Sequence, residues 1–97
     1  MRRREILRLE VRRRLVEALR GLAPGARVIL FGSITRPCDF HERSDVDIAL
    51  LEEPRACSRF QLAARLEEEL DRPVDLVILS ESRLKDKIER EGEEWTS

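Results

Sequence analysis

Apolar positions along the chain fall into alternating helical and strand patterns. Between residues 3 and 22 they recur every three or four positions among arginines, which predicts an amphipathic helix closed by a glycine and proline turn. A second helix is predicted over 58–71, and a last one begins near Ser80 and frays near Gly92. The side chains of the second helix predicted to face the core are Phe60, Leu62, Leu66 and Leu70.

Three apolar runs predict β-strands over residues 27–31, 45–51 and 73–79. A polar connection over 37–44 separates the first two, so we expect them to be antiparallel. Strands that alternate with helical patterns imply a sheet with helices packed on it. The sequence therefore predicts an α+β fold in αβα layers, with a small mixed sheet of about three strands.

Length and charge limit the classes of function. A chain of 97 residues makes one domain, 1–97. The 19 Lys and Arg residues nearly cancel the 20 Asp and Glu residues, so net charge indicates neither a nucleic-acid nor a membrane partner. No stretch reaches the length of a membrane span, and a cytoplasmic location is expected.

The first helix is the exception to this balance. The segment MRRREILRLEVRRRLVEALR has eight arginines and three glutamates. It has no aromatic side chain for stacking on bases, so direct nucleic-acid binding is disfavoured and a solvated helix face is preferred.

Carboxylates interrupt the strands at three positions. Alternation along a strand places Asp45 and Asp47 on one face, and Asp75 stands alone in the apolar run PVDLVIL. A buried, unpaired carboxylate is costly, and neighbouring carboxylates repel unless a cation lies among them. Oxygen ligands of this kind suit Mg²⁺ or Mn²⁺. In the alternative, Asp45 starts its strand, Asp47 faces solvent and Asp75 pairs with an arginine.

The pair Gly32-Ser33 follows the first strand. Glycine permits a close approach of backbone to ligand, and a short helical turn from Ser33 to Arg36 would present amides to a phosphate. A strand followed by Gly-Ser is common, however, so this pair indicates a phosphate-binding site only in combination with the three carboxylates.

Together, FGSITRPCDFHERSDVDIALL and the later Asp75 resemble the core of the polymerase-beta-like nucleotidyltransferases, and the small size resembles their minimal (MNT) branch. Two departures are visible: Pro37 stands where a glycine often follows the arginine, and the loop before Asp45 is about one residue longer than usual. The matching positions are Gly32, Ser33, Arg36, Ser44, Asp45, Asp47 and Asp75.

The resemblance implies transfer of a nucleoside monophosphate, AMP from ATP being favoured, to a hydroxyl acceptor with two Mg²⁺ ions or Mn²⁺ in their place. Asp45 and Asp47 would bridge both ions, and Asp75 would hold the second ion and accept the proton. The residues expected on the nucleotide are Gly32, Ser33, Arg36 and Ser44, with the first two on the terminal phosphates and Arg36 on the leaving pyrophosphate.

The resemblance also implies a partner. Members of the minimal branch commonly pair with a small helical HEPN protein, a ribonuclease toxin that some of them neutralise by adding AMP to a tyrosine. In the alternative function, the chain is a low-turnover nucleotide-binding or partner-binding module that neutralises a HEPN protein by complex formation. A homo-oligomer is also compatible with the small size, and Trp95 suits an interface as well as a core.

Overall fold

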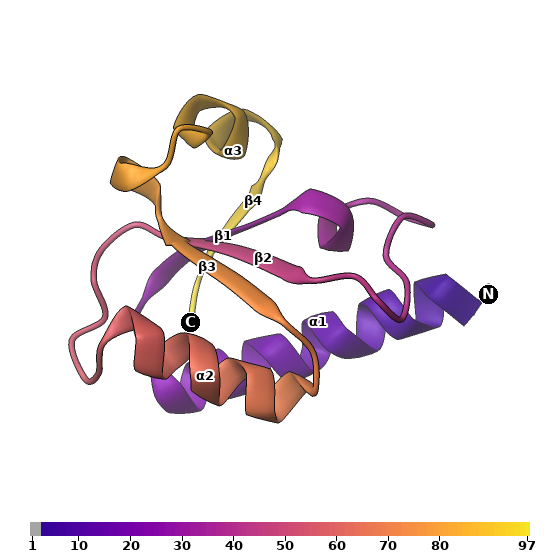
Figure 1. Cartoon of the computed structure of the whole chain (residues 1–97), viewed down its shortest axis with the longest axis horizontal. Coiled ribbons are helices and arrows are strands. Elements are labelled where there is room, and N and C mark those ends of the chain that lie inside the picture. The colour runs from indigo at the N-terminus through magenta and orange to yellow at the C-terminus, as the bar shows by residue number, and fades with distance from the viewer. Residues whose placement is uncertain (1–2) are drawn as a thin grey trace.

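Helices and strands alternate along the chain in the computed structural model, which describes residues 3–97 (Figure 1). The elements are α1 (Arg3–Leu22), β1 (Arg27–Phe31), the 3₁₀ turn η1 (Gly32–Thr35), β2 (Val46–Leu50), α2 (Arg59–Leu70), β3 (Val74–Ile78), the 3₁₀ turn η2 (Leu79–Glu81), α3 (Lys85–Glu91) and β4 (Glu93–Thr96). This arrangement confirms the predicted α+β class.

The strands form one mixed sheet in the order β3-β2-β1-β4. β1 is antiparallel to both β2 and β4, as predicted for the first pair, and β2 is parallel to β3. The prediction of about three strands was therefore one strand short. The last helix was also predicted to begin too early, because η2 occupies the residues after β3 and α3 starts only at Lys85.

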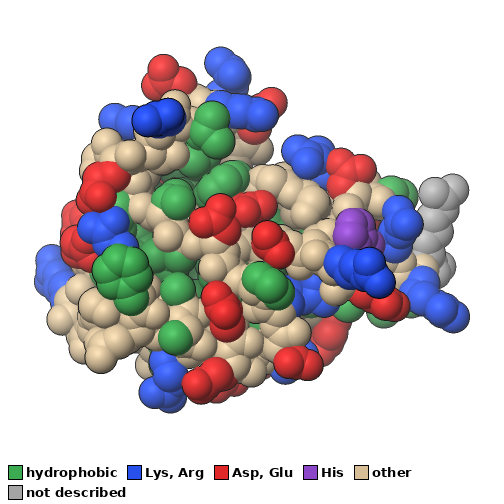
Figure 2. Space-filling view, viewed as in Figure 1, with side chains coloured by type: hydrophobic (Ala, Val, Ile, Leu, Met, Phe, Trp, Pro, Cys, Tyr) green, Lys and Arg blue, Asp and Glu red, His purple; other side chains and the backbone are tan. Residues whose placement is uncertain are grey.

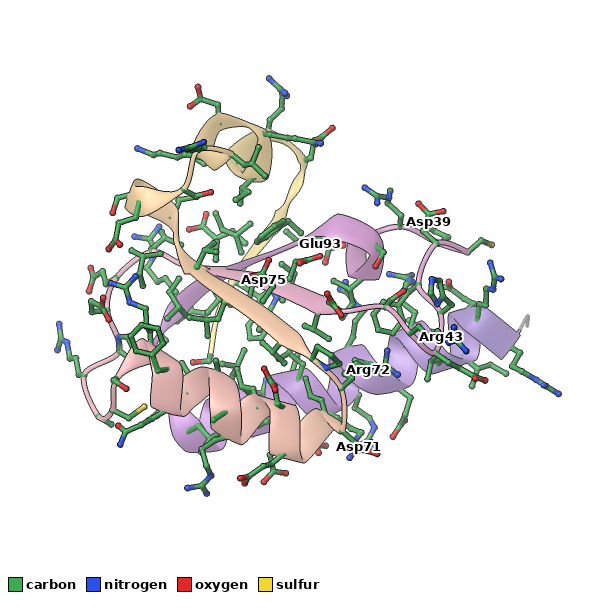
Figure 3. The ribbon with its side chains drawn as sticks, viewed as in Figure 1. Asp39, Arg43, Asp71, Arg72, Asp75 and Glu93 are labelled. Carbon is green, nitrogen blue, oxygen red and sulfur yellow. The ribbon has the colours of Figure 1, made fainter. Side chains whose placement is uncertain are left out.

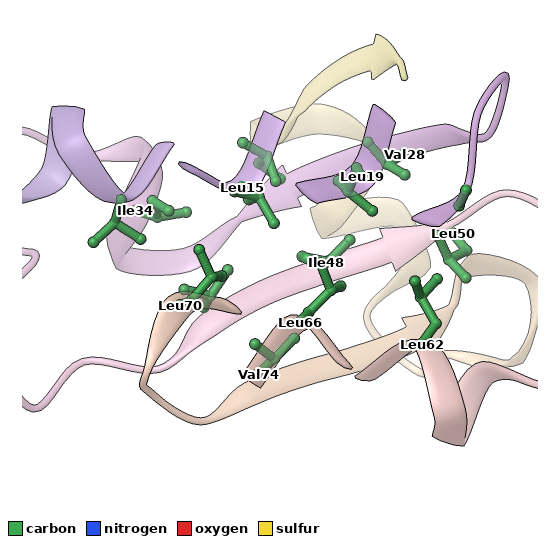
Figure 4. Packing of buried hydrophobic residues seen from close by; sticks show 14 of the residues in the cluster. Leu15, Leu19, Val28, Ile34, Ile48, Leu50, Leu62, Leu66, Leu70 and Val74 are labelled. Atoms are coloured by element: carbon green, nitrogen blue, oxygen red, sulfur yellow. The ribbon is translucent and has the colours of Figure 1, made fainter. Parts of the chain in front are cut away.

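The main core lies between the sheet and the layer formed by α1 and α2 (Figure 4). Ser58 caps α2 with a capping box, in which its side chain accepts from the Gln61 amide, so this helix starts where the sequence predicted. The fully buried side chains of this core include Leu15, Leu19, Val28, Leu30, Ile34, Phe40, Ile48, Leu50, Leu62 and Leu66.

Phe60 is the exception to the predicted inward face of α2, because 79% of it is exposed. Leu62, Leu66 and Leu70 repeat every four residues and are buried. Phe60 precedes Leu62 by two positions, which on a helix is a rotation of about 200° toward the opposite side. The prediction that Phe60 packs inward was wrong.

The second face of the sheet is only partly covered. Ile29, Ala49, Leu79 and Ile88 make a small cluster beneath α3 and η2. Gly92 ends α3 so close to β1 that an added Cβ would overlap the Ile29 side chain. The same face continues past this cluster to the start of β2 and β3, whereas α3 packs on β1 and η2.

Trp95 belongs to the core rather than to a free surface. It pairs with Val28 across β4 and β1, and its partly buried ring packs against the main cluster. The backbone amide of Ser97 donates to the Ala26 carbonyl at 2.9 Å, which ties the end of the strand to the start of β1. Within residues 3–97, no helix has the length and apolar character needed to cross a membrane.

Candidate active site

Asp47 and Asp75 are direct neighbours across the parallel pair β2 and β3. Asp45 precedes Asp47 by two residues, so strand alternation directs it toward the same face. Asp47 is half-buried, whereas Asp45 and Asp75 are exposed. The expectation that Asp75 is buried was wrong, because β3 is an edge strand and the sheet face is open at this end (Figure 3).

The pKa of Asp47 reflects its partial burial and the charges beside it. Burial, followed by the negative charges of Asp75 and Asp45, raises the pKa of Asp47 from its ordinary 3.8 to about 6, while the positive charge of Arg36 opposes the shift. The site thus disfavours negative charge on the one carboxylate that is partly withdrawn from water. A cation placed among these groups would remove that penalty.

Gly32 brings the backbone directly against Asp47. It follows β1 with φ at +76°, a left-handed conformation that suits glycine, and a Cβ at this position would overlap the Asp47 carboxylate. The register explains the contact, since Phe31 at the end of β1 pairs with Asp47. No side chain other than hydrogen fits between this turn and the carboxylate.

The turn η1 begins at Gly32 and confirms the short helical turn predicted after β1. The Thr35 hydroxyl donates to the Gly32 carbonyl at 2.7 Å, and the Arg36 amide donates to the Ser33 carbonyl at 3.1 Å. Underneath, Arg8 of α1 donates from Nη1 to the Ile34 carbonyl at 3.0 Å. These bonds hold the backbone of Gly32 and Ser33 in place beside the carboxylates.

Arg36 and Ser44 lie on the connection between η1 and β2. Arg36 is exposed and its Nε lies 2.6 Å from Asp39 Oδ2, so a phosphate at this guanidinium would compete with Asp39. Ser44 is buried, and its hydroxyl accepts from the His41 amide at 2.9 Å. The structure thus gives Ser44 a role within the loop, and its contact with a nucleotide stays a prediction.

Arg72 is a site-supporting residue that the sequence patterns did not reveal. It stands between α2 and β3, and its Nη1 donates to the carbonyls of His41 at 3.2 Å and Ser44 at 3.0 Å (Figure 3). Its guanidinium carbon lies 4.7 Å above the centre of the buried Phe40 ring. These contacts span 28 and 31 residues, so no local spacing could have predicted them.

The donor chemistry of the site fits Mg²⁺. Its side chains offer hard carboxylate oxygens from two adjacent strands, and burial together with the charges of Asp75 and Asp45 raises the pKa of Asp47. Within residues 3–97, no three acidic, His or Cys side chains are gathered closely enough to form a ready-made metal site. Binding would therefore require these carboxylates to turn toward a shared ion, while their backbone positions already adjoin.

Comparison with known families identifies this arrangement. Residues 16–96 match the family described as polymerase beta, nucleotidyltransferase. The chain belongs to this nucleotidyltransferase family. The matched range contains Gly32, the connection to β2 and the carboxylates of both strands, so every predicted site residue of this nucleotidyltransferase lies inside it.

Solved structures place the nucleotidyltransferase beside the minimal branch. A chain of a toxin–antitoxin complex with AMP-PNP is 30% identical with a TM-score of 0.68, over 88% of this chain and 73% of that one. A chain from the complex of tri-AMPylated Shewanella oneidensis HEPN toxin with MNT antitoxin is 26% identical with a TM-score of 0.65, over 93% and 73%.

A chain of the MntA–HepT toxin–antitoxin complex is also 26% identical, with a TM-score of 0.64 over 92% of this chain and 73% of that one. These neighbours confirm the resemblance to minimal nucleotidyltransferases. No curated protein matches the sequence of this nucleotidyltransferase.

Proposed function

We propose that this nucleotidyltransferase transfers AMP from ATP to a hydroxyl group on a helical HEPN protein and acts as the antitoxin of that protein. The observation that carries the proposal is the pairing of Asp47 with Asp75 beside the Gly32 turn. The neighbours support the nucleotide and the acceptor, because one complex contains AMP-PNP and another a tri-AMPylated HEPN toxin.

The carboxylates of Asp45, Asp47 and Asp75 would hold two Mg²⁺ ions, with Mn²⁺ as a substitute. When bound, such ions neutralise phosphate charge and make the acceptor hydroxyl more acidic. The raised pKa of Asp47 supports this role, because the carboxylate lies where an added positive charge is favourable.

The remaining residues act on the nucleotide and the acceptor. Gly32 and Ser33 bind the terminal phosphates on the turn η1. Arg36 leaves its ion pair with Asp39 and binds the leaving pyrophosphate instead. The Ser44 hydroxyl accepts from the His41 amide and so helps to hold the loop before β2. Ser44 is also the fourth residue predicted to contact the nucleotide.

The reaction balances as a single displacement. The acceptor oxygen forms a bond to the α-phosphorus while the bond from that phosphorus to the bridging oxygen breaks, and pyrophosphate leaves. Asp75, which is exposed at the open edge, takes the proton of the acceptor hydroxyl. Much of the rate in such transfers comes from positioning and charge stabilisation.

The experiment incubates the protein with Mg²⁺, the HEPN protein encoded beside it, and ATP labelled at either the α- or the γ-phosphate. We expect α-label on the HEPN protein and none from the γ-position. Asp47→Asn and Asp75→Asn should each reduce transfer by about a hundredfold or more. Asp86→Asn, at an exposed position in the first turn of α3, is the control and should transfer normally.

Transfer of γ-label would contradict nucleotidyl transfer. Neutralisation of the HEPN protein without ATP, undiminished in Asp47→Asn and Asp75→Asn, would instead establish the binding-module alternative. The two results are distinguishable because the ribonuclease activity of the partner is measured separately from its labelling.

A further inference from the structure

A groove lies between the first turns of α1 and the loop His41–Arg43. Its volume is about 630 Å³, and on the helix side it is lined by Arg3, Arg4, Ile6 and Leu7. We call it the α1 groove. In Figure 2, the single histidine, which lines the groove, lies beside basic side chains on the same face of the molecule as the central group of acidic side chains.

The helix wall of the α1 groove carries one apolar side chain that the fold leaves unpacked, Ile6, beside Leu7, which packs against the main core. Farther along α1, Val11, Leu15 and Leu19 are buried in the core. Ile6, however, is 54% exposed, although it is one of the apolar positions whose spacing predicted an amphipathic helix. Figure 1 shows that the first turns of α1 extend past the ends of the strands, so the sheet does not cover this part of the helix.

The rim of the α1 groove is positively charged. Arg3, Arg4 and Arg43 are exposed there, and they outnumber the exposed acidic side chain of the loop wall, Glu42. Glu10 also lines the groove, but its carboxylate lies 2.6 Å from the Arg13 guanidinium, which offsets its charge. An apolar strip edged by arginines complements an amphipathic helix that carries Asp or Glu beside its apolar face.

The α1 groove adjoins the candidate active site through a shared loop. His41–Arg43 forms one wall, and the next residues are Ser44 and Asp45, which begin the site. Arg72 binds the carbonyls of His41 and Ser44 and so fixes this loop to the α2–β3 turn. A protein seated in the groove would therefore have its surface close to the carboxylates.

We propose that the α1 groove is the docking site for an acidic amphipathic helix of the HEPN protein, an inference that rests on the proposed function. Docking there holds the acceptor protein beside Asp45 without occupying the phosphate-binding turn. Binding in the groove thus selects the acceptor protein, and the carboxylates on β2 and β3 carry out the transfer.

The test compares two substitutions at equally exposed apolar positions. Ile6→Asp changes the groove, whereas Leu84→Asp changes a residue that is also 54% exposed and precedes α3. Both place a carboxylate near a helix N-terminus, where it is tolerated, so neither should unfold the protein. Affinity for the HEPN protein is measured by calorimetry, and circular dichroism verifies the fold.

We expect Ile6→Asp to weaken the complex at least about tenfold and Leu84→Asp to leave it unchanged. Arg43→Glu should weaken it at low salt and less at high salt, whereas Arg83→Glu, an exposed arginine before α3, should not. ATP binding should be unaffected in all four variants.

Full affinity of Ile6→Asp and Arg43→Glu, or loss of affinity in Leu84→Asp, would overturn the proposal. Self-association of the isolated wild type that Ile6→Asp abolishes would assign the groove to a second copy of this chain, and RNA binding lost in Arg43→Glu would assign it to nucleic acid. Wild-type binding without AMP transfer would refute the proposed function while leaving the docking test valid.

Discussion

Asp47 and Asp75 occupy paired positions of two parallel strands, and the pKa of Asp47 is raised to about 6 by burial and by the charges of its neighbours. The sheet thus holds the two backbone positions side by side despite the repulsion between the carboxylates. Such an arrangement lowers the stability of the protein without ligand and favours a cation.

The stability of the free protein should therefore depend on Asp47 in a defined pH range. Below its ordinary pKa of 3.8 the carboxyl is protonated in both folded and unfolded chains and contributes nothing. Between 3.8 and about 6 the unfolded chain loses its proton first, so folding becomes less favourable as pH rises.

Asp47→Asn removes this penalty. We expect a higher melting temperature than wild type near pH 7, a smaller difference near pH 5 and none near pH 3. Asp45→Asn, at an exposed position, should give a smaller gain near neutral pH. A variant that is equally or less stable than wild type near pH 7 would contradict the raised pKa.

Gly32 and Gly25 offer a matched pair for testing the close turn. Both have positive φ, at +76° and +80°, but an added Cβ meets the Asp47 carboxylate at residue 32 and nothing within 4 Å at residue 25. Alanine at either position should cost about 1–2 kcal/mol of backbone strain in the free energy of unfolding.

Gly32→Ala should differ from Gly25→Ala in function. We expect it to displace the Asp47 carboxylate and to lower AMP transfer by about tenfold or more, as measured with α-labelled ATP. Equal transfer rates in the two variants, with equal urea midpoints, would show that the Gly32 contact is not needed for the site.

Arg72 should act as a positioning residue. Arg72→Ala removes charge-assisted hydrogen bonds to the loop before β2, and we expect a loss of about 1–3 kcal/mol in urea unfolding. The rate constant of transfer should fall by a larger factor than the KM for ATP rises, because Arg72 holds the Ser44 side of the site, whereas Arg8 separately holds the phosphate-binding turn.

Arg72→Lys should restore part of the rate, since a lysine supplies the charge without the planar fork. Arg14→Ala is the control: Arg14 also donates to a backbone carbonyl, that of Glu69, away from the loop. If Arg72→Ala and Arg14→Ala change stability and rate alike, Arg72 has only a structural role.

Trp95 provides a spectroscopic test of the fourth strand. It is the sole tryptophan, and it packs on the main core from β4. Its fluorescence should shift to the red on unfolding, and Trp95→Ala should cost roughly 2–4 kcal/mol in urea unfolding. A solvent-exposed emission maximum in the native protein would contradict this packing.

The local patterns in the sequence determined much of this protein. Apolar periodicity predicted α1 and β1 with the observed bounds, and α2 within a residue at each end. The short polar connection after β1 predicted its antiparallel pairing with β2. The spacing from Gly32 to Asp75 indicated the nucleotidyltransferase family that residues 16–96 match.

Tertiary structure decided what depends on distant neighbours. β4 is four residues long and mostly polar, and it exists as a strand because it pairs with β1, which is far away in the sequence. Asp75 is exposed because β3 lies at an edge, and Ile6 is exposed because its turn of helix extends beyond the sheet. Strand pairing and burial arise only when the chain has closed on itself, so a linear pattern records which residues are able to pack but not which of them find a neighbour.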